Sequence, residues 1–315
     1  MSELFRKSLF LKLAFVALLY GALTAEPHAP KSILDSRPLE IERVASAEPV
    51  KSGAADVMTH AHNDYEQDRP LYDALANGFT SVEADIWLSH GKVAISHLGW
   101  SFKGTLEELY LNPLQTLVTK KGSVYGDHQP FFLWLEIKDS NPQLRVALHE
   151  LLAKYPMLGK SVLPILTGND ESKKKYFQEF PDAPVLRDSE SFSFKDPSHT
   201  NNDKWSWYSL PWSRYFFWKG KGALSPLEVA RLQTLVDSIH ALGRKIRFWG
   251  TPDTEDFWSL AMTSHVDAIG TDSLGALGQF ITSGNTACNK SDHEKAQDPC
   301  PVRVTSNSHN LRMWK

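Results

Sequence analysis

Short apolar stretches alternate with segments of helical periodicity from residue 56 onward. The apolar stretches are bounded by turn residues, which is typical of buried strands, and they cover residues 56–60, 80–87, 131–137, 161–166, 184–187, 206–210, 245–249 and 267–270. Apolar residues recur at three- and four-residue steps over 70–77, 142–154, 225–242 and 253–264, which predicts helices. This alternation over about 230 residues favours an α/β fold, a (β/α)8 barrel of the TIM type, with an open doubly wound sheet as the alternative.

The chain before residue 56 predicts a targeting segment and a linker. Residues 1–12 are basic, and residues 13–25 form an uncharged apolar run, which is the pattern of a secretory signal peptide. The run is shorter than the roughly 20 residues that span a bilayer comfortably. We therefore expect export to a periplasmic or extracellular location, with a membrane anchor formed by an uncleaved segment as the alternative. Residues 26–55 are expected to form a linker.

The barrel is expected to cover residues 56–282 and to be followed by a short polar tail over 283–315. This tail contains the two cysteines of the chain, Cys288 and Cys300. Because disulfides persist in exported proteins, we expect these cysteines to form one disulfide.

Composition excludes several classes of function. The chain has 315 residues, of which 42% are hydrophobic and 23% are charged, as in ordinary globular proteins. It has 34 Lys and Arg against 37 Asp and Glu, so no basic excess supports nucleic-acid binding. Two cysteines are too few for a cysteine-based zinc site. Neither a Walker loop nor a strand-following GxGxxG motif is present, which disfavours a nucleotide cofactor.

Carboxylates gather where the second and third predicted strands end, and functional side chains of a parallel barrel collect at these ends. Glu83 and Asp85 alternate onto one face of a strand, and Glu136 lies near the end of the next. Three neighbouring carboxylates repel one another unless a cation lies among them. Ligation by oxygen alone suits Mg²⁺ or Ca²⁺, so the sequence predicts one divalent cation held by these three residues.

Two histidines and a lysine accompany the carboxylates. His62 follows the first predicted strand, and His97 follows a second run, 92–96, which forms a hairpin-like extension of the second strand. Beside a cation, two imidazoles predict an acid/base pair or a nucleophile/acid pair. Lys138 offers a point charge for a phosphate oxygen. His60 is a core or supporting residue, or else the true imidazole of the first strand.

The order of these residues carries a resemblance. The segments concerned are Ala61-His62, Ser81-Val82-Glu83-Ala84-Asp85, His97, Leu135-Glu136-Ile137-Lys138, Val236 to Trp249 and Asp267 to Asp272. Together they resemble the glycerophosphodiester phosphodiesterase family, part of the barrel superfamily related to phosphatidylinositol-specific phospholipase C. The phrase His62-Asn63-Asp64-Tyr65 with Arg69-Pro70-Leu71 is similar to a subgroup that includes the fungal altered-inheritance-of-mitochondria protein 6. The resemblance covers about residues 56–282.

The resemblance implies a metal-dependent phosphoric diester hydrolase. It gives His62 and His97 as the catalytic imidazoles, Lys138 as a phosphate contact and Trp249 as a wall of the substrate pocket, and its metal ligands are the three carboxylates already named. The spacing to the second strand favours His62 over His60 as the catalytic imidazole of the first strand.

Two positions depart from the family pattern. Asn63 stands where an arginine usually follows the first histidine, and Leu98 stands where an aspartate usually follows the second. Asn63 is therefore a candidate substrate-binding residue, and Arg69 replaces the missing arginine only if its loop folds inward.

The expected substrate is a glycerophosphodiester or a phospholipid-type molecule, either small or lipid. If it carries a neighbouring hydroxyl, internal attack gives a cyclic phosphate, as in a lyase. The aromatic run 205–218 predicts either strand and core or a lipid-facing rim, so peripheral membrane contact stays open.

Two other functions remain alternatives. A metal-dependent amidohydrolase would use His60 and His62, but the fifth and sixth predicted strands contain no histidine. A catalytically inactive barrel that binds a headgroup is favoured by the missing arginine and opposed by the retained carboxylates and imidazoles.

Overall fold

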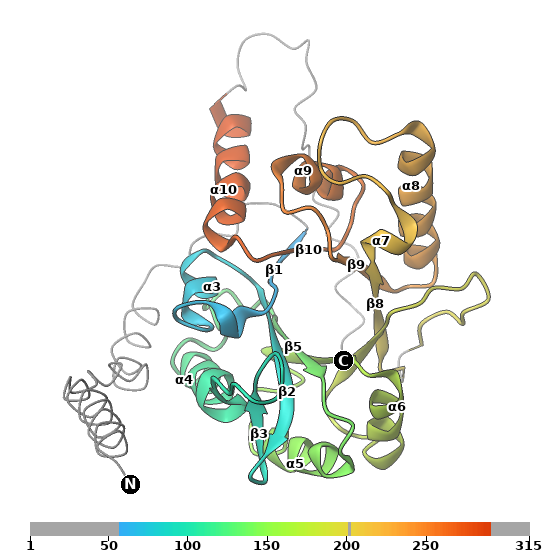
Figure 1. Cartoon of the computed structure of the whole chain (residues 1–315). Helices are drawn as coiled ribbons and strands as arrows, with labels where there is room; N and C mark the ends of the chain where they lie inside the picture. The colour runs from blue at the N-terminus through green and yellow to red at the C-terminus, as the bar shows by residue number, and fades with distance from the viewer. Residues whose placement is uncertain (1–56, 201–202, 291–315) are drawn as a thin grey trace, which may run out of the picture. The chain divides into compact units, whose positions relative to one another are not determined.

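Eight parallel strands close into a barrel in the computed structural model, which describes residues 57–200 and 203–290, with the backbone alone over 284–290 (Figure 1). In chain order the barrel strands are β1 (Met58–Ala61), β2 (Ser81–Ser89), β5 (Phe131–Ile137), β6 (Val162–Gly168), β7 (Leu186–Ser189), β8 (Trp205–Pro211), β9 (Lys245–Trp249) and β10 (Ala268–Thr271). Strand β1 pairs with both β10 and β2, which closes the ring. The predicted barrel is confirmed, and the open sheet is wrong.

Strand β2 continues beyond its parallel neighbours into an antiparallel extension. Its second half pairs with β3 (Lys92–Ile95), and β3 pairs in turn with β4 (Gly104–Thr105). The hairpin brings the end of β3 back to the barrel, where the Ser96 amide donates to the Asp85 carbonyl over 3.2 Å. His97 is thereby placed at the barrel mouth, the edge formed by the carboxyl ends of the parallel strands.

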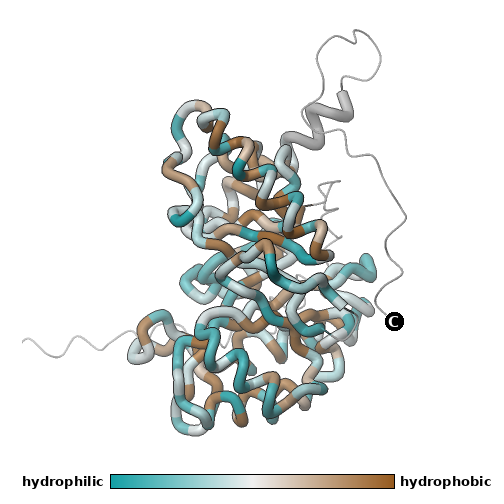
Figure 2. Tube along the Cα trace, turned by 90° about the vertical axis from the view of Figure 1, so that its right-hand side faces the viewer, coloured by the Kyte–Doolittle hydropathy of each residue, from teal (hydrophilic) through white to brown (hydrophobic). Residues whose placement is uncertain are grey.

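Helices surround the ring of strands. Helices α3 (Tyr72–Ala76), α5 (Pro142–Leu152), α8 (Pro226–Ala241) and α9 (Glu255–Thr263) confirm the four predicted ones. Helix α8 begins as expected, with the Ser225 side chain accepting from the Glu228 amide and with proline in its first turn. Helices α4 (Asn112–Lys121) and α6 (Asp170–Glu179) were not predicted. Apolar and polar residues are interspersed along the helices in Figure 2, as expected for helices with one face on the barrel.

Three short elements lie between the longer ones: a 3₁₀ turn over Asp64–Glu66, a π turn over Glu107–Leu111 and the one-turn helix α7 (Trp212–Tyr215). Helix α10 (Leu274–Lys290) runs beyond residue 282, where the barrel domain was expected to end.

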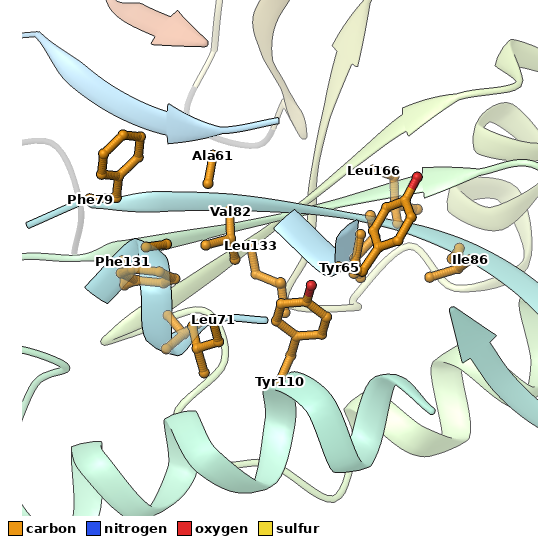
Figure 3. Packing of buried hydrophobic residues seen from close by; sticks show 14 of the residues in the cluster. Ala61, Tyr65, Leu71, Phe79, Val82, Ile86, Tyr110, Phe131, Leu133 and Leu166 are labelled. Carbon is orange, nitrogen blue, oxygen red and sulfur yellow. The ribbon is translucent and has the colours of Figure 1, made fainter. Parts of the chain in front are cut away.

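Two apolar clusters hold the barrel together. The larger one fills the space between strands and helices, and Figure 3 shows the part around Tyr65, Leu71, Phe79 and Tyr110. The smaller one fills the inside of the barrel and contains Met58, Trp134, Ile165, Trp207 and Ala268 from five different strands. Two residues further along these same strands the inward positions are His60, Glu136, Thr167, Ser209 and Gly270. Because inward positions recur every second residue, an apolar floor is followed by a mostly polar layer that faces the mouth.

Several predictions fall on residues that are not described. Outside the described residues lie the predicted signal segment 1–25, the predicted linker 26–55 and Cys300. Cys288 lies where the backbone alone is described, so the predicted disulfide falls outside the description. Among the described residues, no helix combines the length and the hydropathy that a membrane crossing requires.

Asp64 is a buried carboxyl group beneath the loop that leads into α3. It accepts hydrogen bonds from the Leu71 amide over 2.6 Å and from the Tyr110 hydroxyl over 2.9 Å, while its Oδ1 has no partner among the described residues. Burial outweighs these two hydrogen bonds and raises the pKa of Asp64 to about 7. The folded protein therefore retains a proton that the unfolded chain releases near its ordinary pKa.

We expect Asp64 to make the free energy of unfolding fall as the pH rises from 3.8 to about 7. Asp64→Asn keeps an accepting oxygen and cannot ionise, so its stability should lack this part of the pH dependence. Urea denaturation of both proteins across this range measures the difference. If the free energy of unfolding depends on pH in the same way in both proteins, the argument from the burial of Asp64 is contradicted.

Candidate active site

Three carboxylates converge at the mouth. Each of Glu83, Asp85 and Glu136 offers an oxygen, and these oxygens lie within 4.8 Å of one another. The parallel register of β2 and β5 sets Asp85 opposite Glu136. Gly168, at the end of β6, leaves room for the Glu136 side chain: it has a φ of +81°, and a Cβ there would lie 2.7 Å from Glu136 Cγ. The carboxylate cluster formed by these three acids matches the sequence prediction.

The carboxylate cluster fits a hard divalent cation. Asp85 is fully buried, and its Oδ1 has no hydrogen-bond partner among the described residues. An unpaired buried carboxylate oxygen is costly unless a cation or donor meets it. Burial, and then the charges of Glu83 and Asp85, raise the pKa of Glu136 to about 7. Oxygen donors without nitrogen or sulfur suit Mg²⁺ or Ca²⁺.

Lys138 partly compensates this negative charge. Its Nζ lies 2.8 Å from Glu136 Oε1 and 3.3 Å from Asp85 Oδ2. Burial lowers the pKa of Lys138, but its contacts with Glu136 and Asp85 outweigh burial and raise it. The predicted phosphate contact is therefore an ammonium group that lies against the carboxylate cluster.

His62 is held at the mouth by an acid from the last strand of the barrel. Its Nδ1 lies 2.9 Å from Oδ1 of Asp272, which follows β10. Burial lowers the pKa of His62, but the hydrogen bond to Asp272 and the charges of Glu83 and Asp272 outweigh burial and raise it. A carboxylate on Nδ1 fixes the tautomer and leaves Nε2 for proton transfer.

His97 is also held by a carboxylate, which belongs to the cluster itself. Its Nδ1 lies 3.2 Å from Asp85 Oδ2 and 3.2 Å from the Tyr65 hydroxyl. That hydroxyl donates to Asn63 Oδ1 over 2.9 Å, so its oxygen is free to accept from Nδ1–H of His97. Asn63 has a φ of 46°, a conformation that asparagine tolerates better than most residues. Asn63 thus positions Tyr65 and, through it, His97.

A second group of charges lies deeper in the barrel. His60 Nδ1 is 2.9 Å from Ser81 Oγ, and its Nε2 is 2.8 Å from both Glu83 Oε2 and Arg247 Nη1. Burial and the charge of Arg247 lower the pKa of His60 to about 4. Both ring nitrogens of His60 are thus engaged in hydrogen bonds within the core, as expected for a residue that holds its neighbours in place. Neither nitrogen is left to bind the metal ion of an amidohydrolase.

A pocket with a volume of about 100 Å³ opens beside His62. Its lining includes Arg247, Trp249 and Asp272. Trp249 forms part of the wall and is 41% exposed, in the position expected from the sequence. Arg69 instead pairs with Asp73, with Nη2 2.6 Å from Oδ1, so it does not replace the arginine missing after His62.

Sequence patterns gave no role beside the two histidines to three residues that organise the site. Tyr65 lies three residues after His62, Asp272 is the acid that an amidohydrolase would use at the last strand, and Arg247 interrupts the apolar strand Lys245–Trp249. The sequence did contain one indication of a role for Arg247, because a charged residue at an inward position of a covered strand needs a buried partner or a ligand.

The fold and the site define a TIM-type barrel with a candidate metal-assisted active site at its mouth. Residues 49–142 match the family model of the AIM6-like phosphodiesterase domain. This segment contains both site histidines, the three carboxylates and Lys138.

The chain is similar to fungal proteins named altered inheritance of mitochondria protein 6. It is 25% identical over 238 residues to the protein of Saccharomyces cerevisiae (strain RM11-1a), with 61% of each chain covered. It is 26% identical over 281 residues to that of Eremothecium gossypii, with 70% of this chain and 68% of the relative covered. The chain thus spans about three fifths of the length of the Saccharomyces relative. These matches confirm the resemblance to the subgroup that includes altered inheritance of mitochondria protein 6.

Asp85→Asn should abolish the response of the protein to divalent cations. We expect Mg²⁺ or Ca²⁺ at a hundredfold excess over the dissociation constant to stabilise the original protein by about 2.7 kcal/mol and to leave the variant unchanged. Without a cation the variant should be no less stable, because one of three repelling charges is gone. Thermal unfolding in chelator and in added cation measures both effects.

Asp188→Asn is the matched control, because Asp188 is also fully buried but does not belong to the carboxylate cluster and instead pairs with Lys173, with Nζ 2.7 Å from Oδ1. It should lose stability and keep its response to cations. An Asp85→Asn protein that responds like the original would refute the cation site.

Proposed function

We propose that this protein is a metal-dependent phosphoric diester hydrolase that acts on a glycerophosphodiester or phospholipid-type substrate. One observation carries the proposal: two imidazoles, each with Nδ1 within hydrogen-bond distance of a carboxylate, share the barrel mouth with an all-oxygen ligand set. The match to an AIM6-like phosphodiesterase domain supports the same reaction class. A cation bound by the carboxylate cluster would supply neutralisation of the charge on the non-bridging phosphoryl oxygens.

His62 is proposed as the base or nucleophile. Its Nε2 takes the proton of the attacking water as the new oxygen–phosphorus bond forms. The carboxylate of Asp272 on Nδ1 stabilises the imidazolium that results. If the substrate carries a neighbouring hydroxyl, the same proton transfer from that hydroxyl gives a cyclic phosphate in place of the hydrolysed product.

His97 is proposed as the acid. Its Nε2 donates a proton to the leaving alkoxide oxygen as the second phosphorus–oxygen bond breaks. Asp85 and Tyr65 on Nδ1 keep the ring in this orientation. One proton is thus taken up at His62 and one is released at His97, and proton exchange with water restores both histidines before the next turnover.

Apolar side chains near the mouth support a lipid-like substrate. Trp100 follows His97 closely and is 75% exposed, and Phe217, in the loop after α7, is 84% exposed. This loop lies beside the pocket rim, because a Cβ on Gly220 would lie 2.5 Å from Pro252. Aromatic side chains suit the interface between water and lipid, so we propose peripheral membrane contact on this side. Export remains a proposal that rests on the sequence.

A panel of phosphodiesters tests the substrate. Glycerophosphodiesters, phospholipids and sphingolipids are incubated with Mg²⁺, with Ca²⁺ and with chelator, and ³¹P NMR identifies the products. We expect cleavage that requires the cation. A cyclic phosphate product would show that the protein cleaves the diester as a lyase. Binding of a headgroup without turnover of any diester would contradict the proposed function.

His62→Ala and His97→Ala should each lower kcat by about 10²- to 10⁴-fold with alkyl diesters, because each removes a proton-transfer group. With a p-nitrophenyl diester, whose leaving group needs little protonation, only the loss in His97→Ala should shrink substantially. Steady-state kinetics with the two substrates measures the difference. Full turnover by either variant would contradict the two-histidine scheme. If instead the loss in kcat shrinks with the p-nitrophenyl diester only in His62→Ala, then His62 is the acid and His97 the base.

A further inference from the structure

Arg247 is a buried guanidinium held rigidly inside the barrel. Its side chain is 5% exposed. Nε donates to Ser209 Oγ over 2.8 Å, and Nη1 lies 3.0 Å from Glu83 Oε2. The guanidinium carbon lies 4.1 Å from the centre of the Trp134 ring, so one face of the group stacks on an aromatic surface. These contacts leave the side chain little freedom to reorient.

One nitrogen of this group is unused. Among the described residues Nη2 has no hydrogen-bond partner, although Arg247 lines the pocket beside His62 and Trp249. A buried guanidinium with a free donor at an open pocket is suited to an anion, because charge-assisted hydrogen bonds in such surroundings are strong and directional.

Other cationic side chains around the mouth are committed elsewhere. Lys138 contacts Glu136 and Asp85, and Arg69 pairs with Asp73 outside the pocket. Asn63, which directly follows His62, accepts from Tyr65. The position after His62 therefore provides no cation for a phosphoryl group.

We propose that Nη2 of Arg247 donates a hydrogen bond to a non-bridging phosphoryl oxygen of the bound diester. The inference rests on the proposed function and names the residue that binds the phosphoryl group. Because Glu83 contacts Arg247 and belongs to the carboxylate cluster, the guanidinium and the cation site are adjacent. A phosphoryl oxygen that accepts from Arg247 would therefore lie beside the carboxylates that would hold the cation.

Binding of diethyl phosphate in the presence of Mg²⁺ tests the contact without turnover. We expect Arg247→Lys and Arg247→Gln to raise the dissociation constant about 10- to 100-fold in ³¹P NMR titrations, because a hydrogen bond to a charged group is lost. Arg244→Lys is the matched control: Arg244 is also buried, lies 4.0 Å from the Trp205 ring centre and pairs with Asp203 at the other end of β9. It should leave the dissociation constant unchanged. Unchanged binding in both Arg247 variants overturns the proposal.

Phosphorothioate diesters separate this contact from a structural role. Sulfur accepts hydrogen bonds poorly, so the diastereomer whose sulfur faces Arg247 should be cleaved more slowly than the corresponding oxygen diester. Arg247→Lys should reduce this rate ratio about tenfold, whereas Arg244→Lys should retain it. Rate ratios equal to the original for both diastereomers in Arg247→Lys overturn the proposal. If the original protein cleaves no diester, the proposed function fails, and the binding titration alone decides the role of Arg247.

Ser209→Ala gives a milder test if the Arg247 variants do not fold. It removes the hydrogen bond on Nε and keeps the positive charge. We expect the dissociation constant for diethyl phosphate to rise about threefold to tenfold, because the guanidinium loses part of its fixed orientation. A folded Ser209→Ala protein with unchanged binding would overturn the proposal.

Discussion

The mutual repulsion of Glu83, Asp85 and Glu136 is the constraint around which the barrel mouth is organised. Each acid has some positive or donating group beside it: Arg247 and His60 contact Glu83, while Lys138 contacts the other two. Asp85 Oδ1 nevertheless remains without a partner among the described residues. A divalent cation completes such a set, because it satisfies this oxygen and relieves the repulsion in one step.

The fold places this cluster by simple geometry. Inward positions alternate along each strand, so the apolar layer around Trp134 and Trp207 is followed by a polar layer at the next inward position. The apolar layer is a firm floor, and it lets Arg247 stack on Trp134 instead of contacting water. The extension of β2 then brings His97 to the cluster, with its Nδ1 3.2 Å from Asp85 Oδ2. Rigid elements rather than flexible loops thus hold most of the site.

Sequence patterns located the eight barrel strands, because most covered strands form apolar runs that turn residues interrupt. The exception is β7 (Leu186–Ser189), which is largely polar and shares only two residues with the predicted stretch 184–187. They were insufficient for α6, whose segment Asp170–Glu179 is polar around nearly its whole circumference and buries few residues. The carboxylate cluster was predictable because parallel strands bring their carboxyl ends together. Two other contacts, that of Asp272 with His62 and that of Arg247 with Glu83, could not be predicted from the sequence. They form only when distant strands meet as the barrel closes.

The location of a bound cation tests the central claim most directly. Crystals soaked in Mn²⁺, which favours oxygen ligands and scatters anomalously, would reveal the ion. The account predicts one strong anomalous peak within direct coordinating distance of the three acids, with Lys138 displaced or retained beside them. A peak at another place on the barrel, or a fully ordered mouth without any ion at saturating Mn²⁺, would contradict it.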